Sequence, residues 1–417
     1  MKVLEIEGAK PLSGSINIGG AKNSAVALIP ACILSNNLTT LTNVPDITDI
    51  NVLEEILTHL GVKVSRASQS IVIDPSEMKN NLIPDDLSCK LRASYYFMAS
   101  LLAKYKKVEM YFPGGCQIGS RPIDQTLKIF EAMGAKVVEK DCLFSITAKK
   151  LKGCDVTLDM PSVGATVNGI IASTLCEGSV VIHNAAREPE IVDVADMLNK
   201  MGAKIEGAGT STVKITGVKE LDGCFHSVMP DRIEAGTYII LGCLVGDYLH
   251  INNINPEHIK NLTDKLVECG ADIVINEDNI VANKSDNLTG IDVETRGYPG
   301  FATDLQQPLV TLLTQATGKS EIEETIYENR YMNVPFLNKM GANINVNKRH
   351  ATVLGKTELK GCEVEATDLR AGASLLLAGL KAKGITKIYH ADYILRGYED
   401  IIEKLTNIGA KISIYEE

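Results

Sequence analysis

The phrase KMGAKI, residues 200–205, sets a glycine between an amphipathic run and a short apolar one, and five close copies of it occur along the chain. The copies are HLGVKV (59–64), AMGAKV (132–137), ECGADI (268–273), KMGANI (339–344) and NIGAKI (407–412). From Gly61 to Gly409 the successive glycines are 73, 68, 68, 71 and 68 residues apart. Such even spacing indicates six copies of one structural unit.

The residues around each phrase predict a helix followed by a strand. Runs such as VLEEILTHL (52–60) have apolar residues at helical spacing, and a glycine suits the left-handed residue that ends a helix. Each unit also holds an earlier helix that starts about 38 residues before its glycine, for example in VGATVNGIIASTL (163–175). These earlier helices are apolar on nearly all sides, so we expect them to be buried.

Six units in 417 residues suggest an α/β protein of two domains with three units each. The helix starts near the middle of the chain favour a boundary near residue 230. We therefore expect a first domain over 21–229 and a second over 230–417 together with 1–20. The first twenty residues hold two strands that the six phrases leave over, and we expect this segment to pair with the last repeat and close the second domain.

The composition is that of an ordinary globular protein, with 45% hydrophobic and 23% charged residues. A formal charge of -10 argues against nucleic acid or an anionic membrane as the main partner. We expect neither a signal peptide nor a membrane span. The ten cysteines form no Cys-x-x-Cys pair and have no zinc-ligand spacing, so we expect a reduced, cytoplasmic protein without a metal ion.

The starts of the earlier helices differ between repeats, so they are the candidate functional positions. They hold Lys22-Asn23, Arg92, Ser162-Val163-Gly164, Arg232, Asp304 and Arg370. The later helices are expected to start about 13 residues before their glycines, and two of them have arginine there, Arg121 and Arg396. Helix N-termini and arginines both attract phosphate and carboxylate groups, so the set favours an anion-binding cleft. The alternative is that single arginines pair with carboxylates of neighbouring units.

Two further residues have open interpretations. Asp304 in GYPGFATDLQQ (297–307) is either an N-cap or first-turn acid or a general base in a cationic cleft, and the sequence alone favours the cap. Cys116 in FPGGCQIGSRPID (112–124) is either a surface thiol or a reactive one, because nearby cations lower the pKa of a thiol. The glycines around it allow the loop to fold over a cleft.

Together these stretches resemble the UDP-N-acetylglucosamine 1-carboxyvinyltransferases, the enolpyruvyl transferases that commit UDP-N-acetylglucosamine to bacterial peptidoglycan. The resemblance covers the whole chain and rests on GGAKNSA (19–25), PGGCQIGSRPID (113–124), NAAREPEIVD (184–193), ENR (328–330) and ATDLRA (366–371). It implies the EPSP-synthase-like fold of two inside-out α/β barrels, each of three βαβαββ-like units, with the active site in the interdomain cleft. The six-fold repeat agrees with that architecture.

The resemblance also implies roles for named residues. Phosphoenolpyruvate would be bound by Lys22, Asn23, Arg92, Arg121, Arg370 and Arg396. UDP-N-acetylglucosamine would be bound by Arg92, Arg121, Pro122, Ile123, Asp124, Gln125, Ser162, Val163, Gly164, Asp304, Ile326 and Arg330. The catalytic set would be Cys116, Asp304, Lys22, Asn23 and Arg396, with Asp304 accepting the proton of the sugar 3′-hydroxyl and Cys116 acting as general acid or forming a covalent adduct. No metal ion or organic cofactor is implied, and Cys116 would be the target of the epoxide inhibitor fosfomycin.

Two departures from the family pattern concern affinity rather than chemistry. Ile394-Leu395 precedes Arg396, where many members have isoleucine and aspartate, and Met160 stands at an often basic position. Two alternatives remain open. One is 3-phosphoshikimate 1-carboxyvinyltransferase, which shares the fold but uses another acceptor. The other is a non-catalytic homologue that binds UDP-sugar and regulates a partner. The sequence does not give the oligomeric state.

Overall fold

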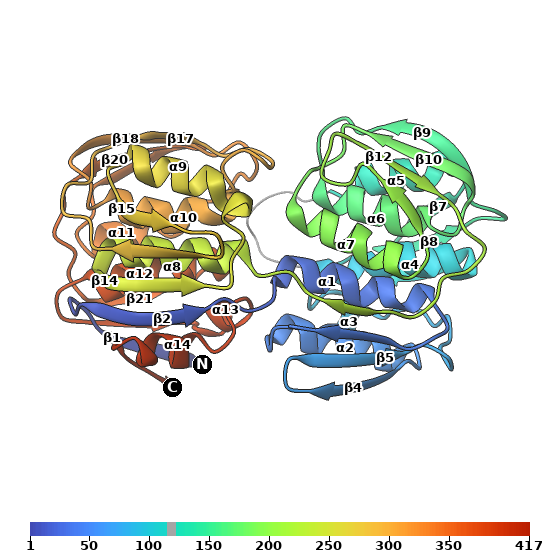
Figure 1. Cartoon of the computed structure of the whole chain (residues 1–417), viewed down its shortest axis with the longest axis horizontal. Helices are drawn as coiled ribbons and strands as arrows, with labels where there is room; N and C mark the ends of the chain where they lie inside the picture. The colour runs from blue at the N-terminus through green and yellow to red at the C-terminus, as the bar shows by residue number, and fades with distance from the viewer. Residues whose placement is uncertain (115–121) are drawn as a thin grey trace. The chain divides into compact units, whose positions relative to one another are not determined.

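The computed structural model describes residues 1–114 and 122–417, and these form two compact units. The N-terminal unit comprises residues 20–114 and 122–229, and the C-terminal unit comprises residues 1–19 and 230–417. Each unit has its own buried apolar core. Figure 1 shows both units, with labels on many of their helices and strands.

The N-terminal unit contains three repeats. Its helices are α1 (Lys22–Ala31), α2 (Thr48–His59), α3 (Asp85–Ser88), α4 (Tyr96–Tyr105), α5 (Asp124–Ala132), α6 (Val163–Ser173) and α7 (Pro189–Lys200). Its strands are β3 (Thr39–Thr42), β4 (Lys63–Ala67), β5 (Ser70–Asp74), β6 (Lys107–Tyr111), β7 (Lys136–Lys140), β8 (Leu143–Thr147), β9 (Lys152–Thr157), β10 (Glu177–His183), β11 (Lys204–Glu206), β12 (Thr212–Thr216) and β13 (Phe225–Ser227). The third repeat has the full order β9-α6-β10-α7-β11-β12, which is the expected βαβαββ unit.

The C-terminal unit repeats this plan. Its helices are α8 (Arg232–Val245), α9 (Lys260–Glu268), α10 (Thr303–Leu313), α11 (Val334–Lys339), α12 (Leu369–Lys381), α13 (Asp392–Leu395) and α14 (Ile401–Asn407). Its strands are β1 (Lys2–Glu7), β2 (Leu12–Asn17), β14 (Gly246–Asn252), β15 (Asp272–Ile275), β16 (Asn279–Asn283), β17 (Asp292–Glu294), β18 (Gly318–Glu323), β19 (Ile344–Asn347), β20 (His350–Gly355), β21 (Glu363–Glu365), β22 (Ile385–Tyr389) and β23 (Lys411–Glu416). The fold is therefore the expected two-unit α/β fold.

The earlier helices of the repeats form the inside of each unit, and the sheets lie outside them. Every residue of α8 is buried, and α10 and α12 pack against it and against each other (Figure 1). The strands of the described residues form six sheets, of which five have four strands with one parallel edge pair, as in β17-β18-β20-β19. The sixth, β6-β8-β7, has only an isolated parallel bridge, Ile83 to Met110, beside β6. This arrangement confirms the inside-out barrels and the burial predicted for the apolar helices.

The six predicted helix-ending glycines all adopt the left-handed conformation. Their φ angles run from 78° at Gly61 to 107° at Gly341, and each glycine lies two residues after the last residue of its helix. A side chain at such a position costs conformational energy that glycine avoids. The recurring phrase therefore records a backbone requirement that is shared by all six units.

Strands distant in sequence close both units. β1 pairs antiparallel with β22 and β23 of the last repeat, which brings the termini side by side, with the Met1 amino group donating to the Glu417 carbonyl at 2.6 Å (Figure 1). The predicted pairing of the first segment with the last repeat is thus confirmed for β1. β2, however, pairs parallel with β14 of the first repeat in this unit. In the N-terminal unit β13 pairs parallel with β3 in the same way.

A buried carboxyl group lies where the chain leaves the C-terminal unit. Glu234, in the first turn of α8, is 4% exposed; it accepts a hydrogen bond from the Gly19 amide at 3.1 Å and pairs with Lys404 at 2.7 Å. Burial raises the pKa of Glu234 to about 7, because it outweighs the opposing effect of Lys404. Because the pKa of Glu234 in the folded chain lies above the ordinary 4.5, the folded chain binds this proton more tightly than the unfolded chain does. The contribution of Glu234 to the free energy of unfolding is therefore fully present below pH 4.5 and is lost as pH rises through about 7.

We expect Glu234→Gln to remove most of this pH dependence. The change in the free energy of unfolding between pH 5 and pH 8 should become smaller by about 2–3 kcal/mol. Urea unfolding at a series of pH values measures it. Glu403→Gln, at an exposed position of α14, serves as the matched control and should leave the profile unchanged. An unaltered profile in Glu234→Gln would contradict the assignment.

Candidate active site

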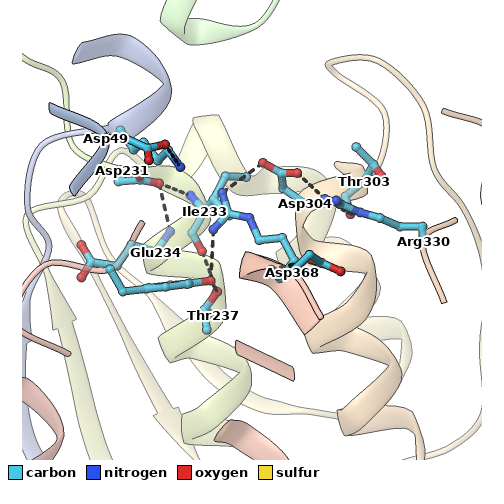
Figure 2. Close-up of polar contacts among 12 residues, drawn as sticks. Asp49, Asp231, Ile233, Glu234, Thr237, Thr303, Asp304, Arg330 and Asp368 are labelled. Carbon is cyan, nitrogen blue, oxygen red and sulfur yellow. Dashed lines mark hydrogen bonds and ion pairs between the residues drawn. The ribbon is translucent and has the colours of Figure 1, made fainter. Parts of the chain in front are cut away.

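The starts of α8, α10 and α12 bring basic and acidic side chains together in the C-terminal unit. Asp231 caps α8 by accepting hydrogen bonds from the Ile233 and Glu234 amides at 2.8 and 3.0 Å (Figure 2). Asp368 caps α12 in the same way, by accepting from two amides at 2.9 and 3.0 Å. Arg232 and Arg370 are therefore held at or next to the first residue of their helices, as the sequence predicted.

Asp304 lies in the first turn of α10, but its side chain does not cap the helix. The N-cap is Ala302, and the Asp304 carboxylate pairs with Arg330 through Oδ1 and with Arg370 through Oδ2, the latter at 3.0 Å (Figure 2). The first-turn placement was predicted correctly, whereas the N-cap interpretation was wrong. The reason is that two guanidinium groups from other repeats offer the carboxylate stronger, charge-assisted hydrogen bonds.

This pairing governs the proton affinity of Asp304. Burial alone would raise the pKa of the carboxyl group, but Arg370 and Arg330, with a further contribution from Arg232, hold it well below its usual range. The Asp304 side chain is 27% exposed, whereas the Arg330 and Arg370 side chains are 3% and 5% exposed. The site thus presents one accessible carboxylate on a nearly buried cationic support.

A buried tyrosine fixes Arg370. Its Nη1 donates to the Tyr398 hydroxyl at 3.2 Å, and its guanidinium carbon lies 5.6 Å from the centre of that ring. The Tyr398 hydroxyl also forms a hydrogen bond with Thr237 of α8 at 2.9 Å. Tyr398 was not predicted from the sequence, because a tyrosine in RGYED (396–400) gives no sign of a hydrogen bond to another repeat.

In the N-terminal unit, Lys22 begins α1 as predicted. Its Nζ lies 2.7 Å from Oδ2 of Asp49, which is 3% exposed by side chain and belongs to the first turn of α2. Asn23 is exposed, and the next residue, Ser24, is buried and hydrogen-bonds to Asp193. Asp193 ends the motif NAAREPEIVD, so this contact joins it to the motif GGAKNSA. Neither Asp49 nor Asp193 was predicted as part of the site.

Arg92 lies in a short 3-10 helix (Arg92–Tyr95) that leads into α4. Its Nη1 donates to the Pro113 carbonyl at 3.2 Å, and its guanidinium group lies over the rings of Tyr95 and Phe112 at 5.5 and 5.2 Å. Arg92 is thereby held against Pro113, one residue before the first described range ends.

Two predicted nucleotide-binding segments lie together in the N-terminal unit. Gln125 at the start of α5 donates to Asp159 at 3.0 Å and accepts from the Asp159 amide at 2.9 Å, which ties α5 to the segment before α6. Ser162 caps α6 by accepting from the Ala165 amide at 3.3 Å. Pro122, Asp124 and Val163 are exposed, Ser162 and Gly164 are half-buried, and Ile123 and Gln125 are buried.

Tyr95, like Tyr398, was not predicted from the sequence, and its side chain lies directly against Gly164. A Cβ atom built on Gly164 would lie 1.4 Å from the Tyr95 hydroxyl oxygen. Glycine to alanine normally stabilises a helix, but here the added methyl group has no room. We expect Gly164→Ala to destabilise the protein by about 1–3 kcal/mol.

A double variant separates this clash from other effects. Adding Tyr95→Ala to Gly164→Ala removes the obstructing ring, so the double variant should lose less stability than the sum of the two single variants. Thermal unfolding of all four proteins gives the coupling. Simple additivity would contradict the steric account.

The remaining predicted residues have less defined surroundings. Arg396 was expected to begin a later helix, which is wrong: it is the C-cap of α13, and α14 starts only at Ile401, after Gly397 and the left-handed Asp400 have broken the helix. Ile394 and Leu395 pack on the core, whereas Met160 and Ile326 are 63% and 39% exposed. Cys116 and Arg121 lie outside the described residues.

Comparison with known proteins identifies the family. The model of the EPSP synthase (3-phosphoshikimate 1-carboxyvinyltransferase) family matches residues 6–405. The enolpyruvyl transferase NikO from Streptomyces tendae has a TM-score of 0.91 at 26% identity, covering 99% of this chain and 98% of its own. An EPSP synthase from Acinetobacter baumannii shares the fold, with a TM-score of 0.79 at 17% identity over the whole of both chains. Fold and site thus define an enolpyruvyl transferase of the EPSP synthase family.

Similar curated proteins narrow this class. UDP-N-acetylglucosamine 1-carboxyvinyltransferase 2 of Listeria monocytogenes is 48% identical over 410 residues, which are 98% of this chain and 97% of the relative. The protein of the same name from Bacillus subtilis is 47% identical over 413 residues, which are 99% and 96%. The chain belongs to the UDP-N-acetylglucosamine 1-carboxyvinyltransferase family, as its motifs indicated. None of the helices in residues 1–114 and 122–417 has the length and apolar character needed to cross a membrane.

Proposed function

We propose that the protein transfers the enolpyruvyl group of phosphoenolpyruvate to the 3′-hydroxyl of UDP-N-acetylglucosamine and releases phosphate, in the cytoplasm, as the committed step of peptidoglycan synthesis. The observation that carries the proposal is the accessible Asp304 carboxylate held between Arg330 and Arg370, in a chain that is nearly half identical to carboxyvinyltransferases that are named for this acceptor. Asp304 is the accessible carboxylate beside these two arginines, so it is the proposed general base.

The reaction proceeds by addition and elimination. Asp304 takes the proton of the 3′-hydroxyl while a proton is added to the methylene carbon of phosphoenolpyruvate, which makes C2 electrophilic and lets the sugar oxygen bond to it. The tetrahedral intermediate then loses a proton from its new methyl group as the C2–O bond to phosphate breaks. Cys116 is the proposed general acid, and Asn23 would hydrogen-bond to the intermediate.

Phosphoenolpyruvate carries a phosphate and a carboxylate, which would bind the basic residues Lys22, Arg92, Arg121, Arg370 and Arg396. In the described structure Lys22 pairs with Asp49 and Arg370 pairs with Asp304. The substrate anion therefore competes with two carboxylates of the protein. Arginine suits such positions because its guanidinium group forms paired hydrogen bonds with either a carboxylate or a phosphate group.

This competition activates the base. A carboxylate whose pKa is held far below its usual range by two guanidinium groups is a weak proton acceptor. When Arg370 turns toward the substrate anion, Asp304 loses one of these partners and its pKa rises. Proton acceptance thus depends on bound phosphoenolpyruvate, which restricts the chemistry to the loaded enzyme.

The sugar nucleotide would bind the segments that meet at the starts of α5 and α6. Pro122, Asp124 and Val163 are accessible there, and Tyr95 leaves no room for a side chain at position 164. Helix starts attract phosphate groups, which suits the diphosphate. Ile326 and Arg330 of the C-terminal unit are the proposed contacts to the sugar and the uridine.

The acceptor decides between this function and its alternatives. Phosphate release from phosphoenolpyruvate should require UDP-N-acetylglucosamine, and shikimate 3-phosphate should not replace it. Turnover with shikimate 3-phosphate alone would overturn the proposed acceptor. Binding of the UDP-sugar without any release of phosphate would instead support the regulatory homologue.

A further inference from the structure

The C-terminal unit contains a cavity of about 880 Å³ at the ends of α8, α10 and α12 opposite to the candidate active site. Val245, Gln315 and Lys381, at or just beyond the last residues of these helices, line it. α8 has 14 residues, so the cavity lies roughly 20 Å along the helix from Arg232 and the site beside it. No residue of the proposed reaction lines this cavity.

Lysines gather around the cavity, and two of them have no carboxylate partner among the described residues. Lys381 Nζ donates only to the Leu244 carbonyl at 3.2 Å, and Lys356 Nζ donates only to the Asp286 carbonyl at 3.4 Å. A third, Lys284, pairs with the exposed carboxylate of Asp286. Each ammonium group has three donors, so most donors of Lys356 and Lys381 remain available to a ligand.

These ammonium groups repel one another. Burial lowers the pKa of Lys381 first, and the charges of Lys284 and Lys356 lower it further, whereas the charge of Asp286 acts in the opposite direction. Like charges drawn together at a cavity destabilise the folded chain unless an anion lies between them. Asp247, Asp272 and Glu358 also line the cavity, and Glu358 pairs with Lys383. The charge of Asp286 offsets part of the repulsion at Lys381.

A comparable lysine in the N-terminal unit shows what a purely structural role looks like. Lys104, in the last turn of α4, donates to the carbonyls of Ile33 and Ser35 at 2.8 Å each, at the end of the short 3-10 helix (Cys32–Leu34) that follows α1. It thereby satisfies two carbonyl groups at a helix end. Lys381 makes one longer contact of this kind and has two like charges beside it, so helix-end pairing does not account for the cluster.

An exposed aromatic ring lines the same cavity. Tyr248 is 69% exposed and has a φ of 50°, a left-handed conformation that is costly for a bulky side chain. Tyr248 is the third residue of β14 and lies at the irregularity between Gly246 and Leu249 in the pairing of β14 with β2. An exposed aromatic side chain held in this costly conformation points to a function for its ring.

We propose that this cavity is a second binding site that takes a nucleotide with two or more phosphates, whose base stacks on Tyr248 and whose phosphates bind Lys284, Lys356 and Lys381. An aromatic ring beside a group of ammonium ions matches the two halves of a nucleotide. The three helices that carry Arg232, Asp304 and Arg370 at one end border the ligand at the other. The site is therefore placed to couple nucleotide binding to the candidate active site.

Isothermal titration of the full-length protein with ATP, without magnesium and in the presence of excess UDP-N-acetylglucosamine, tests the proposal. Lys356→Gln combined with Lys381→Gln should weaken ATP binding by at least about tenfold. The matched control, Lys348→Gln combined with Lys360→Gln, removes two exposed lysines that do not line the cavity and should bind ATP as the unaltered protein does. Equal affinity in both double variants, or no ATP binding to the unaltered protein, would overturn the site.

Tyr248→Gly tests the nucleotide assignment separately. Glycine relieves the left-handed strain, so this variant should melt at a higher temperature while its affinity for ATP falls by about fivefold or more. Its affinity for inorganic tripolyphosphate, which has no base to stack, should stay unchanged. Unchanged ATP affinity in Tyr248→Gly would overturn stacking and reduce the site to one for inorganic anions. Because these measurements read binding at the cavity, they stand apart from whether the transferase reaction itself is detected.

Discussion

Asp304→Asn is expected to lower kcat by about 10²–10⁴-fold while UDP-N-acetylglucosamine still binds. Asparagine keeps the shape of the side chain and one acceptor oxygen, but it cannot take a proton from the 3′-hydroxyl. It also leaves Arg330 and Arg370 without their carboxylate partner. Steady-state phosphate release and titration with the sugar nucleotide measure the two effects.

Asp368→Asn is the matched control for this change. Asp368 also begins a helix of the same unit, but its carboxylate caps α12, a role that asparagine fills about equally well. Near-normal turnover in Asp368→Asn together with loss in Asp304→Asn would assign the effect to proton transfer. Near-normal turnover in Asp304→Asn would return Asp304 to a purely structural role as the partner of two arginines.

Cys116→Ser is expected to abolish covalent inactivation by fosfomycin and to lower turnover sharply. A hydroxyl is a far weaker nucleophile and acid than a thiol near neutral pH, because the thiolate is the reactive form. Mass spectrometry of the protein after incubation with the inhibitor shows whether an adduct forms, and phosphate release gives the rate.

Exposed cysteines elsewhere provide the control. Cys89 and Cys142 are both accessible free thiols. Cys89→Ser and Cys142→Ser should keep both turnover and inactivation. A fosfomycin adduct on the Cys116→Ser protein would show that another thiol reacts and would remove Cys116 from the proposed mechanism.

The repeat architecture was predictable because it depends on local backbone geometry. A helix that ends in a left-handed residue strongly favours glycine at that position, so all six units have glycine there. The structure has a positive φ at each of these glycines. The helix starts that carry Lys22, Arg232 and Arg370 were predicted from the spacing between each helix start and the glycine of its repeat. Arg396 did not, because Gly397 and Asp400 interrupt the later helix of its repeat.

The partners within the site were not predictable in the same way. The contact of Asp304 with Arg370 spans 66 residues and that of Lys22 with Asp49 spans two helices, so neither leaves a pattern within a local window. Tyr398 acts through its hydrogen bond with Arg370, and Tyr95 acts through the space that it fills beside Gly164. Such roles depend on how repeats pack, which residue spacing alone does not specify.

Mass spectrometry of the sugar nucleotide after incubation with the protein and phosphoenolpyruvate tests the proposed reaction most directly. The account predicts that UDP-N-acetylglucosamine gains one enolpyruvyl group on its sugar, with one phosphate released for each product formed, and that neither change occurs when either substrate is omitted. An unmodified sugar nucleotide, or release of phosphate from phosphoenolpyruvate in the absence of the sugar nucleotide, would contradict it.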